Sequence, residues 1–299
     1  MNRTVLIVFS WLMVILISHR ETATGEESYP VVWKVTDGLQ APESAYFDKD
    51  SGYIFLSQIG AGGATGKDGD GWISKFTIDG EMVKDKWVTG LNSPKGLRSH
   101  DGTLWVSDID QIVSIDISRG KITQTVKVPG AEFLNDLACG PDGSVYVADM
   151  LPSRIYQYKD SKISVLAEGE QVESPNGLLV NGGKLIIAAW GHDIQDDFST
   201  KTAGRLLAMD LATGEITPIT KKPTGNLDGV EADGRGGYIV TDFKGGKVLH
   251  ISPDGAVKVL MTLSQGVADH AFLQDRGWLI LPVMLENKLT AFDLSKAIR

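Results

Sequence analysis

The sequence predicts an all-β protein folded as a six-bladed β-propeller, and three features of the chain support this prediction. Glycine accounts for 34 of the 299 residues, and its clusters separate short runs rich in β-branched and aromatic residues. A segment of one design recurs about every 40 residues, which is typical of propeller blades with four short strands each. The last segment lacks a fourth strand, whereas a strand-like run near the N-terminus belongs to no complete segment.

The third segment shows the repeated design most completely. It opens with Asn135-Asp136, and strands are expected at residues 137–139, 144–148, 154–158 and 163–166. A Pro-Asp-Gly turn separates the first two strands. No segment after the N-terminal region keeps a convincing helical period, so helices are expected to contribute little.

Each segment carries one residue at the place of Asn135, and we call this residue the anchor. In chain order the anchors are Glu43, Lys95, Asn135, Asn176, Asp228 and Asp269, separated by 52, 40, 41, 52 and 41 residues. The two long steps contain insertions at residues 60–71 and 191–203, between the second and third strands of their units. Since antiparallel strands reverse direction at every turn, we expect both insertions on the face that carries the anchors, where loops commonly carry function.

The two ends of the chain are expected to meet in the last blade. The run at residues 29–35 precedes the first anchor, the position that a fourth strand has in every other unit. We therefore expect it to complete the last blade, which would close the ring and remove an open sheet edge.

The N-terminus resembles an export signal. Arg3 provides a positive charge, residues 5–17 are apolar except for Ser10, and residues 23–25 offer small side chains for cleavage. This run of 13 residues is shorter than the roughly 20 that span a bilayer as a helix. We expect a signal peptide at residues 1–25, one propeller domain at residues 26–299, and a periplasmic or secreted protein. An uncleaved N-terminal anchor is the alternative, because the cleavage site is not a clean Ala-x-Ala.

Charge and cysteine content exclude several classes of function. The net charge is −9 and no basic patch stands out, so nucleic acid is not an expected partner. We expect no membrane contact beyond the signal, and a monomer that acts on a small molecule. The single cysteine, Cys139, cannot form an internal disulfide, and its place in a strand favours a small buried residue over a nucleophile.

The anchors together suggest a metal site. The first strand of each propeller blade lines the central channel, so the anchors are expected to ring one end of it. Apart from Lys95 they offer only carboxylate and amide oxygens, with His270 beside the last anchor. Such ligands suit Ca²⁺ better than Mg²⁺, which demands a tight octahedron, or Zn²⁺, which recruits His or Cys. The alternative is that these short polar residues only begin strands and form turns.

Four of these elements resemble the calcium-binding elements of the gluconolactonase/regucalcin family, also called senescence-marker-protein-like. They are Pro42-Glu43-Ser44, Leu134-Asn135-Asp136, Ser174-Pro175-Asn176-Gly177 and Leu227-Asp228-Gly229. They are also similar to elements of diisopropyl fluorophosphatase and the paraoxonases. The resemblance extends from about residue 29 to the end of the chain. It implies a six-bladed propeller that holds one catalytic divalent metal, usually Ca²⁺, through Glu43, Asn135, Asn176 and Asp228, and that hydrolyses lactones, aryl esters or phosphoesters.

The resemblance also implies roles for individual residues. The metal would polarise the substrate carbonyl, and Asp228 would act either as general base on water or as a direct nucleophile. Asp269 and His270 are further candidates for the base, although a histidine beside a strand start is often structural. Asp136 is expected to orient a metal ligand from behind.

The chain departs from the sugar-lactonase pattern. Regucalcin-like members carry an arginine two residues before the Asn-Asp pair that helps to hold the sugar, and Phe133 occupies that position here. Lys95 would bind an anionic substrate group or pair with the acidic anchors. Trp190 and His192, at the start of the second insertion, join Lys95 and Asn135 as candidates for substrate binding. Together these residues suggest a substrate more apolar than gluconolactone.

Three functions remain open from the sequence. The first is an exported Ca²⁺-dependent or other divalent-metal-dependent hydrolase of lactones or esters. The second is a non-catalytic propeller that binds a ligand or protein around a structural metal. The third is metal-free chemistry of the strictosidine-synthase-like kind on the same fold, which the Glu-Asn-Asn-Asp set disfavours.

Overall fold

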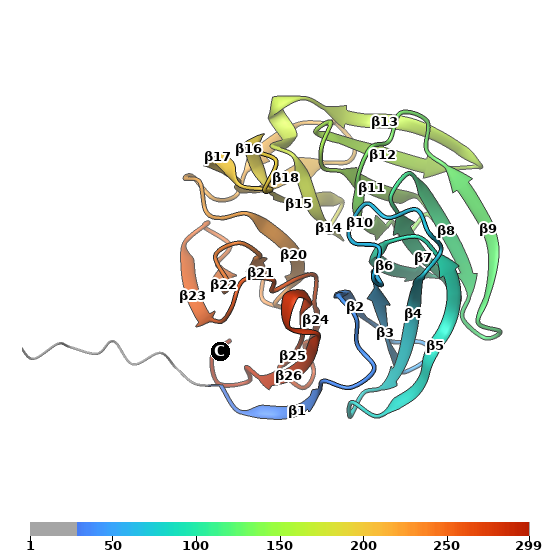
Figure 1. Ribbon diagram of the computed structural model, residues 1–299. Coiled ribbons are helices and arrows are strands. Elements are labelled where there is room, and N and C mark those ends of the chain that lie inside the picture. The colour runs from blue at the N-terminus through green and yellow to red at the C-terminus, as the bar shows by residue number, and fades with distance from the viewer. Residues whose placement is uncertain (1–28, 299) are drawn as a thin grey trace, which may run out of the picture.

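Six four-stranded antiparallel sheets surround a common axis in the computed structural model, which describes residues 29–298 (Figure 1). The first strand of each sheet lies nearest the axis and the fourth lies at the rim (Figure 1). The predicted all-β, six-bladed propeller is therefore confirmed. The expected signal peptide at residues 1–25 lies outside the described residues and stays a prediction. Within residues 29–298, no helix has the length and apolar character needed to cross a membrane.

The blades follow one another along the chain. The first contains β2 (Pro42–Asp48), β3 (Tyr53–Gln58), β4 (Gly71–Thr77) and β5 (Met82–Leu91). The second contains β6 (Pro94–His100), β7 (Thr103–Asp108), β8 (Gln111–Asp116) and β9 (Lys121–Lys127). The third contains β10 (Leu134–Cys139), β11 (Val145–Asp149), β12 (Arg154–Lys159) and β13 (Lys162–Glu168). The fourth contains β14 (Pro175–Asn181), β15 (Lys184–Ala189), β18 (Leu206–Asp210) and β19 (Ile216–Pro218). The fifth contains β20 (Leu227–Ala232), β21 (Tyr238–Asp242), β22 (Lys247–Ile251) and β23 (Val257–Thr262).

The sixth blade is built from both ends of the chain, as expected. Its strands are β24 (Ala271–Leu273), β25 (Trp278–Val283), β26 (Lys288–Asp293) and β1 (Val31–Val35). β1 pairs antiparallel with β26, with Trp33 opposite Ala291 and Val35 opposite Leu289. Trp33 also donates from Nε1 to the carbonyl oxygen of Ile78 in the first blade, at 3.1 Å. The N-terminal strand thus covers the edge of the last blade and fastens it to the first.

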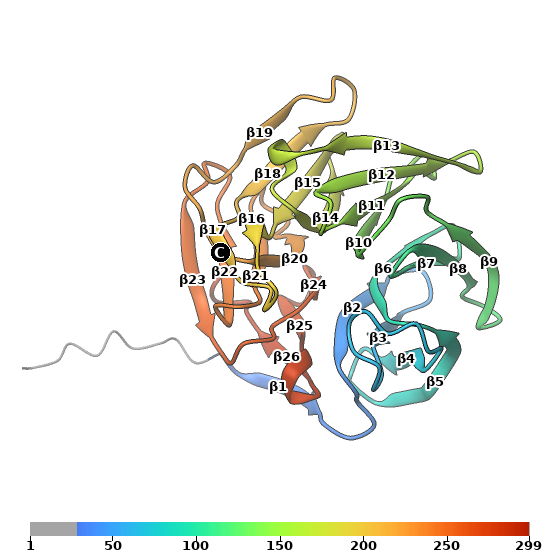
Figure 2. The same ribbon diagram turned by 45° about the horizontal axis from the view of Figure 1, so that its top comes forward.

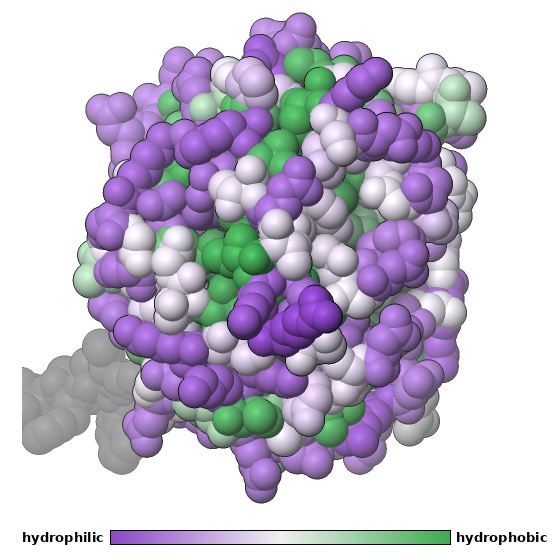
Figure 3. Space-filling view, turned by 90° about the vertical axis from the view of Figure 1, so that its right-hand side faces the viewer, coloured by the Kyte–Doolittle hydropathy of each residue, from purple (hydrophilic) through white to green (hydrophobic). Residues whose placement is uncertain are grey.

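The apolar core lies between neighbouring blades. Ala148 and Ile155 of the third blade and Leu178 and Ile187 of the fourth are fully buried members of one cluster. Strands near the axis, such as β10, are almost entirely buried, whereas the rim strand β9 is exposed along most of its length. Hydrophilic residues predominate on the outer side that Figure 3 shows, and apolar residues form small separate patches there.

The two insertions lie between the second and third strands of their blades, as expected. Residues 60–71 connect β3 to β4 without regular strands. Residues 191–203 form a hairpin rather than a simple loop, with β16 (Gly191–Ile194) paired to β17 (Thr200–Ala203). Figure 2 shows this hairpin beside the fourth blade. Two short 3-10 helices, η1 (Glu170–Val172) and η2 (Met284–Glu286), complete the regular structure of the described residues.

We predict that Trp33→Ala lowers the free energy of unfolding by about 1.5–3 kcal/mol, because it removes a half-buried indole and its hydrogen bond to the first blade. Urea denaturation followed by circular dichroism measures the change. Val31→Ala on the same strand is the matched control, since Val31 is 55% exposed and its loss is expected to change stability by less than about 0.5 kcal/mol. Equal effects of the two substitutions would contradict the role given to β1.

Candidate functional site

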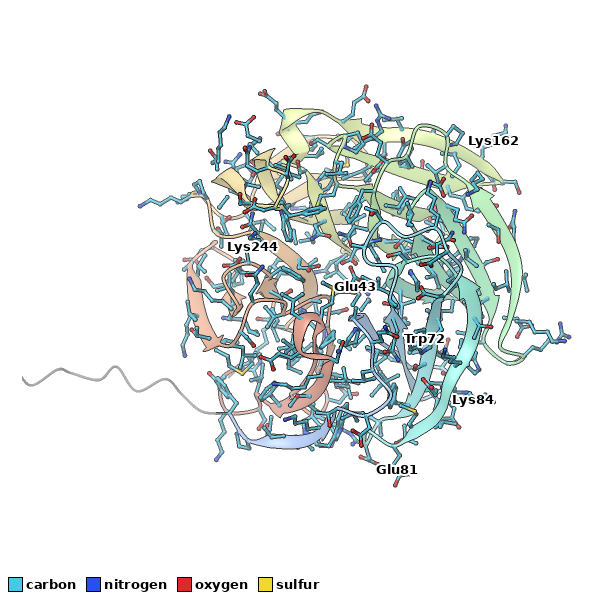
Figure 4. The ribbon with its side chains drawn as sticks, viewed as in Figure 1. Glu43, Trp72, Glu81, Lys84, Lys162 and Lys244 are labelled. Carbon is cyan, nitrogen blue, oxygen red and sulfur yellow. The ribbon has the colours of Figure 1, made fainter. Side chains whose placement is uncertain are left out.

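One cavity of about 220 Å³ opens where the first strands of five blades meet. Their anchors line it: Glu43 on β2, Lys95 on β6, Asn135 on β10, Asn176 on β14 and Asp228 on β20. Figure 4 shows Glu43 near the centre of the ring, whereas Lys84 and Lys162 lie at its periphery. The structure therefore brings together the four residues predicted to hold a metal.

Strand pairing fixes the height of these anchors along the axis. In each of the first five blades, the residue before the anchor pairs with the last residue of the second strand. The pairs are Pro42–Gln58, Pro94–Asp108, Leu134–Asp149, Pro175–Ala189 and Leu227–Asp242. The same register in every blade places the five anchors on one level of the ring.

Carboxylates at the ends of second strands hold the segments that lead into the anchors. Asp108 accepts hydrogen bonds from the backbone amides of Asn92 and Ser93, at 3.1 and 2.7 Å. Asp149 accepts from the amide of Phe133 at 2.7 Å, just ahead of Asn135. Asp242 accepts from the amide of Asn226 at 3.0 Å, just ahead of Asp228. These aspartates therefore fix the connections between blades.

Glycine directly follows three of the anchors, and Gly177 and Gly229 show why no other residue fits there. A Cβ atom at Gly177 would lie 1.9 Å from the carbonyl oxygen of Asp228, and one at Gly229 would lie 2.6 Å from a carboxylate oxygen of Asp269. Neighbouring first strands therefore approach one another so closely that no side chain fits between them. This approach is what brings the anchors of separate blades within reach of a single ligand.

The sixth blade departs from the predicted alignment by one residue. Val267 pairs with Val283, the last residue of β25, so the anchor position of this blade is held by Ala268 rather than by Asp269. Asp269 instead occupies the place that Asp136 has in the third blade. The sequence repeat could not detect this shift, because Asp269 is the polar residue nearest to the expected position.

Asp269 and His270 lie in the protein interior, and neither is among the residues that line the cavity. Asp269 accepts a hydrogen bond from the hydroxyl of Ser44 at 2.6 Å and pairs with the guanidinium of Arg98 at 3.1 Å. Burial lowers the pKa of His270 to about 4, with the charge of Asp269 opposing the shift. Its imidazole is thus neutral at pH 7 and enclosed, so the expectation that His270 acts as a base gains no geometric support.

Four oxygen atoms of the cavity floor have no hydrogen-bond partner among the described residues. They are Glu43 Oε2, Asn135 Oδ1, Asn176 Oδ1 and Asp228 Oδ1, one from each of four blades. Their side chains are between 1% and 6% exposed. Buried polar atoms in native proteins nearly always have a partner. Four buried oxygens without one in a single cavity therefore indicate a bound group that oxygen atoms can coordinate. A set of two carboxylates and two amides is the chemistry that hard cations such as Ca²⁺ prefer, and these residues fit such an ion.

Burial shifts the pKa values of the ionisable residues at the floor of the cavity. Burial raises the pKa of Glu43 to about 8, against the lowering effect of Lys95. Burial also raises the pKa of Asp228, and the charges of Glu43 and Asp269 raise it further. Burial lowers the pKa of Lys95 to about 8, which Glu43 opposes. A bound cation would relieve the two carboxylates, because it would replace the solvation that they have lost.

Lys95 is held by neutral acceptors. Its Nζ donates to the carbonyl oxygens of Ala64 and Ser93, at 3.0 and 3.1 Å, and lies 4.6 Å from the centre of the Phe133 ring. Within residues 29–298 Lys95 makes no ion pair with a carboxylate. The expected ion pair with the acidic anchors is therefore not formed, and Lys95 instead secures the first insertion. Its expected binding of an anionic substrate group stays a prediction, since Lys95 lines the cavity.

Arg98 was not anticipated from the sequence and is the main positive charge below the anchors. Its guanidinium pairs with Asp269 at 3.1 Å and with Glu231 at 3.3 Å, and its charge also acts on Asp136. Both carboxylate oxygens of Asp136 lack hydrogen-bond partners among the described residues, and burial raises its pKa well above the ordinary value. Arg98 lies three positions after an anchor, but the repeat gave no reason to single it out.

Aromatic and aliphatic side chains form the upper wall of the cavity. Phe133, Met150 and Trp190 are buried there, and Phe198 and Phe243 pack against them. Trp190 was expected to bind substrate and does line the cavity. His192 was expected to do so as well, but it is not a lining residue, and its Nε2 lies 4.0 Å from Glu173.

Both insertions reach the cavity, as expected from their predicted position on the face that carries the anchors. Ala64 comes from residues 60–71, and Asp197 and Phe198 come from the β16–β17 hairpin. Phe198 and Phe243 were not identified from the sequence, because they lie in loops and do not occupy positions that recur from one repeated segment to the next. The position of residues 191–203 was the signal that could have found Phe198.

Comparisons with known proteins agree with this arrangement. The sequence model of the family described as "SMP-30/Gluconolactonase/LRE-like region" matches residues 41–272. No curated protein sequence matches the chain at a significant level. A gluconolactonase structure from Xanthomonas campestris shares 15% identity over 88% of this chain and 88% of its own, with a TM-score of 0.66. Virginiamycin B lyase from Staphylococcus aureus, solved as a catalytically inactive variant with quinupristin, shares 16% identity over 88% of this chain and 98% of its own, with a TM-score of 0.61. At these identities the solved structures show the fold alone.

No group of three or more His, Cys, Asp and Glu side chains that could hold a metal ion is found among residues 29–298. The floor of the cavity does not form such a group, since two of its four orphaned oxygens belong to asparagines. A metal in this cavity would therefore be held by carboxylate and amide oxygens together.

We predict that, in a chelator, the protein is less stable at pH 8.0 than at pH 6.5, by about 1 kcal/mol or more. Burial raises the pKa of Glu43 to about 8 and that of Glu231 to about 7, so the folded chain holds protons that the unfolded chain has lost. Stability therefore falls as the pH rises through this window. His270 partly opposes this trend near pH 6.5, because burial lowers its pKa to about 4 in the folded chain while the unfolded chain, with a pKa near 6.5, still binds protons there. Lys95 opposes the trend near and above pH 8, and the two glutamates outweigh both groups.

Urea denaturation at the two pH values measures this difference. Glu231→Gln removes one of the titrating groups and is expected to reduce the difference. Equal or greater stability at pH 8.0 in the unsubstituted protein would contradict the electrostatics described for the channel.

Proposed function

The chain belongs to the SMP-30/gluconolactonase/LRE-like family, whose model matches residues 41–272, and on this basis we propose that it is a divalent-metal-dependent hydrolase of esters or lactones. The single observation that carries the proposal is the set of four orphaned oxygens at the floor of the cavity. We also propose that the protein is exported, as its N-terminal sequence suggests, and that it acts as a monomer on a small molecule.

Glu43, Asn135, Asn176 and Asp228 would hold the metal, with Ca²⁺ as the favoured ion. A divalent cation bound there would supply Lewis-acid polarisation of the substrate carbonyl. The four side chains come from four blades, so the rigid ring defines their separation and keeps the site preorganised. The backbone carbonyl of Asn135 also accepts a hydrogen bond from the hydroxyl of Ser107, which helps to hold this residue in place.

Asp228 is the favoured group for proton transfer. Its carboxylate lines the cavity and has one oxygen without a partner, whereas Asp269 and His270 are enclosed behind the first strands. As a general base, Asp228 would take a proton from water while the water oxygen bonds to the carbonyl carbon and the acyl C–O bond breaks. Asp228 would then return this proton to the departing alkoxide oxygen, so the products are a carboxylic acid and an alcohol, which stay in one molecule when the substrate is a lactone. Direct attack by the Asp228 carboxylate, followed by hydrolysis, is the second route open to the same group.

Asp136 and Arg98 would support this floor without touching substrate. Asp136 follows Asn135 directly and is fully buried, and Arg98 supplies the positive charge beneath it. A non-catalytic propeller around a structural metal would use the same ligands, and the experiment below separates the two functions.

We predict that Asp228→Asn and Asn176→Ala each abolish hydrolysis of aryl esters and lactones, because the first removes a carboxylate charge and the proton acceptor and the second removes an oxygen of the floor. Both are also expected to weaken Ca²⁺ binding by at least about tenfold, measured by calorimetric titration, which corresponds to about 1.4 kcal/mol. Glu81→Gln, an exposed acidic residue at the periphery, is the matched control and is expected to change neither quantity.

Full hydrolysis in excess chelator would contradict the proposed function. Tight Ca²⁺ binding with no turnover across a panel of esters and lactones would favour the non-catalytic alternative instead.

A further inference from the structure

We propose that the cavity selects esters or lactones whose non-reacting part is apolar and carries no hydroxyl groups, and that Phe198 of the β16–β17 hairpin encloses this part. This inference rests on the proposed function for the reaction itself. The selectivity, in contrast, follows from the upper wall of the cavity and can be tested separately.

The upper wall presents rings and thioethers to the cavity. The centres of the Phe133 and Phe198 rings are 5.6 Å apart, and those of Trp190 and Phe243 are 5.7 Å apart, so the four rings make one continuous aromatic surface. Aliphatic neighbours extend this surface around the opening; they are Ile59, Ala64, Met150, Met284 and Leu285. A ligand seated above the floor would therefore be surrounded by apolar atoms.

The indole of Trp190 and the ammonium groups of Lys95 and Lys244 already donate to backbone carbonyls. Trp190 donates from Nε1 to the carbonyl oxygen of Phe198 at 2.9 Å. Lys244 donates from Nζ to the carbonyl oxygen of Asp197 at 2.9 Å, and Lys95 donates to backbone carbonyls of the first insertion and of its own blade. Gln265 is exposed at the rim. The hydroxyl groups of a sugar lactone would lose their hydrogen bonds to water and would contact aromatic rings or donors that already have partners. This loss disfavours the binding of a sugar lactone.

The hairpin holds Phe198 over the cavity. Its backbone has a φ of 59°, an uncommon value for a phenylalanine, and its amide donates to the carbonyl oxygen of Gln195 at 2.8 Å. The bonds from Trp190 and Lys244 fasten the carbonyls of Phe198 and Asp197 to the body of the propeller. Phe198 is thus fixed by its backbone, and its ring closes the apolar wall beside Phe133.

The size of the cavity sets a further limit. Its volume of about 220 Å³ is below the roughly 300–1,000 Å³ of sites that take drug-sized ligands. A compact substrate is therefore expected, such as a phenyl ester of a short acid or a five- or six-membered lactone with a short alkyl chain.

Hydrolysis rates with matched substrates test the selectivity. With Ca²⁺ present, we expect kcat/KM for phenyl acetate and for δ-hexalactone to exceed that for glucono-1,5-lactone by at least about 100-fold. Equal or greater kcat/KM for glucono-1,5-lactone would overturn the inference while leaving the proposed hydrolase function intact.

Substitution of the hairpin residue tests the role of Phe198. Phe198→Ala is expected to raise KM for phenyl acetate by about tenfold or more while kcat changes little, because the ring contributes binding and not chemistry. Val165→Ala, on an exposed part of β13, is the matched control and should leave both constants unchanged. An unchanged KM in a folded Phe198→Ala protein would overturn the role given to the hairpin.

A binding measurement separates this inference from the proposed function. Calorimetric titration is expected to show that the protein binds acetophenone, a neutral ketone that cannot be hydrolysed. The Phe198→Ala protein is expected to bind acetophenone more weakly. Gluconate is not expected to compete for this site. Binding of acetophenone without any hydrolysis of esters would preserve the apolar site and contradict the hydrolase. Hydrolysis of esters without binding of acetophenone, even at millimolar concentration, would contradict the apolar site and preserve the hydrolase.

Discussion

The close approach of the first strands around the axis is the constraint on which the rest of the structure depends. Closing six blades into one ring leaves no room for a Cβ atom at Gly177 or Gly229, and it turns the neighbouring anchors toward a common point. Their oxygens are buried there without partners, which destabilises the fold by about 1–3 kcal/mol for each group left unsatisfied. A cation shared by the four blades would satisfy them together. The geometry that makes the ring compact is thus also the geometry that suits a metal.

The channel combines three chemical environments along its length. Arg98 lies at the lower level, where it balances Asp269 and Glu231. The oxygen set occupies the middle level. Above it, Phe133 and the residues packed around it present mainly apolar atoms to the cavity. An ester group placed between the middle and upper levels would meet polar atoms at its carbonyl and apolar atoms elsewhere, so one small cavity would serve both recognition and chemistry in the proposed hydrolase.

Most of the fold could be predicted from the sequence repeat, because the length of a blade, the insertion sites and the missing last strand are all visible in local sequence. It also placed five anchors correctly, since their register follows from strand pairing that is the same in every blade. It placed Asp269 wrongly, because a one-residue shift in the short first strand of the sixth blade changes the pairing partner without changing the spacing visibly. Arg98 and Phe198 were not found because they act through contacts between segments distant in sequence, which no repeat encodes. His192 was expected at the cavity from its place in the second insertion, but the hairpin turns its side chain toward Glu173.

The most direct test of the central claim is an anomalous difference map from a crystal of the protein grown with Ca²⁺ and then exchanged into Tb³⁺. The account predicts one strong peak within coordination distance of Glu43, Asn135, Asn176 and Asp228, and its loss in the Asp228→Asn protein. No peak at these oxygens, in a protein that hydrolyses esters at its full rate in chelator, would contradict it.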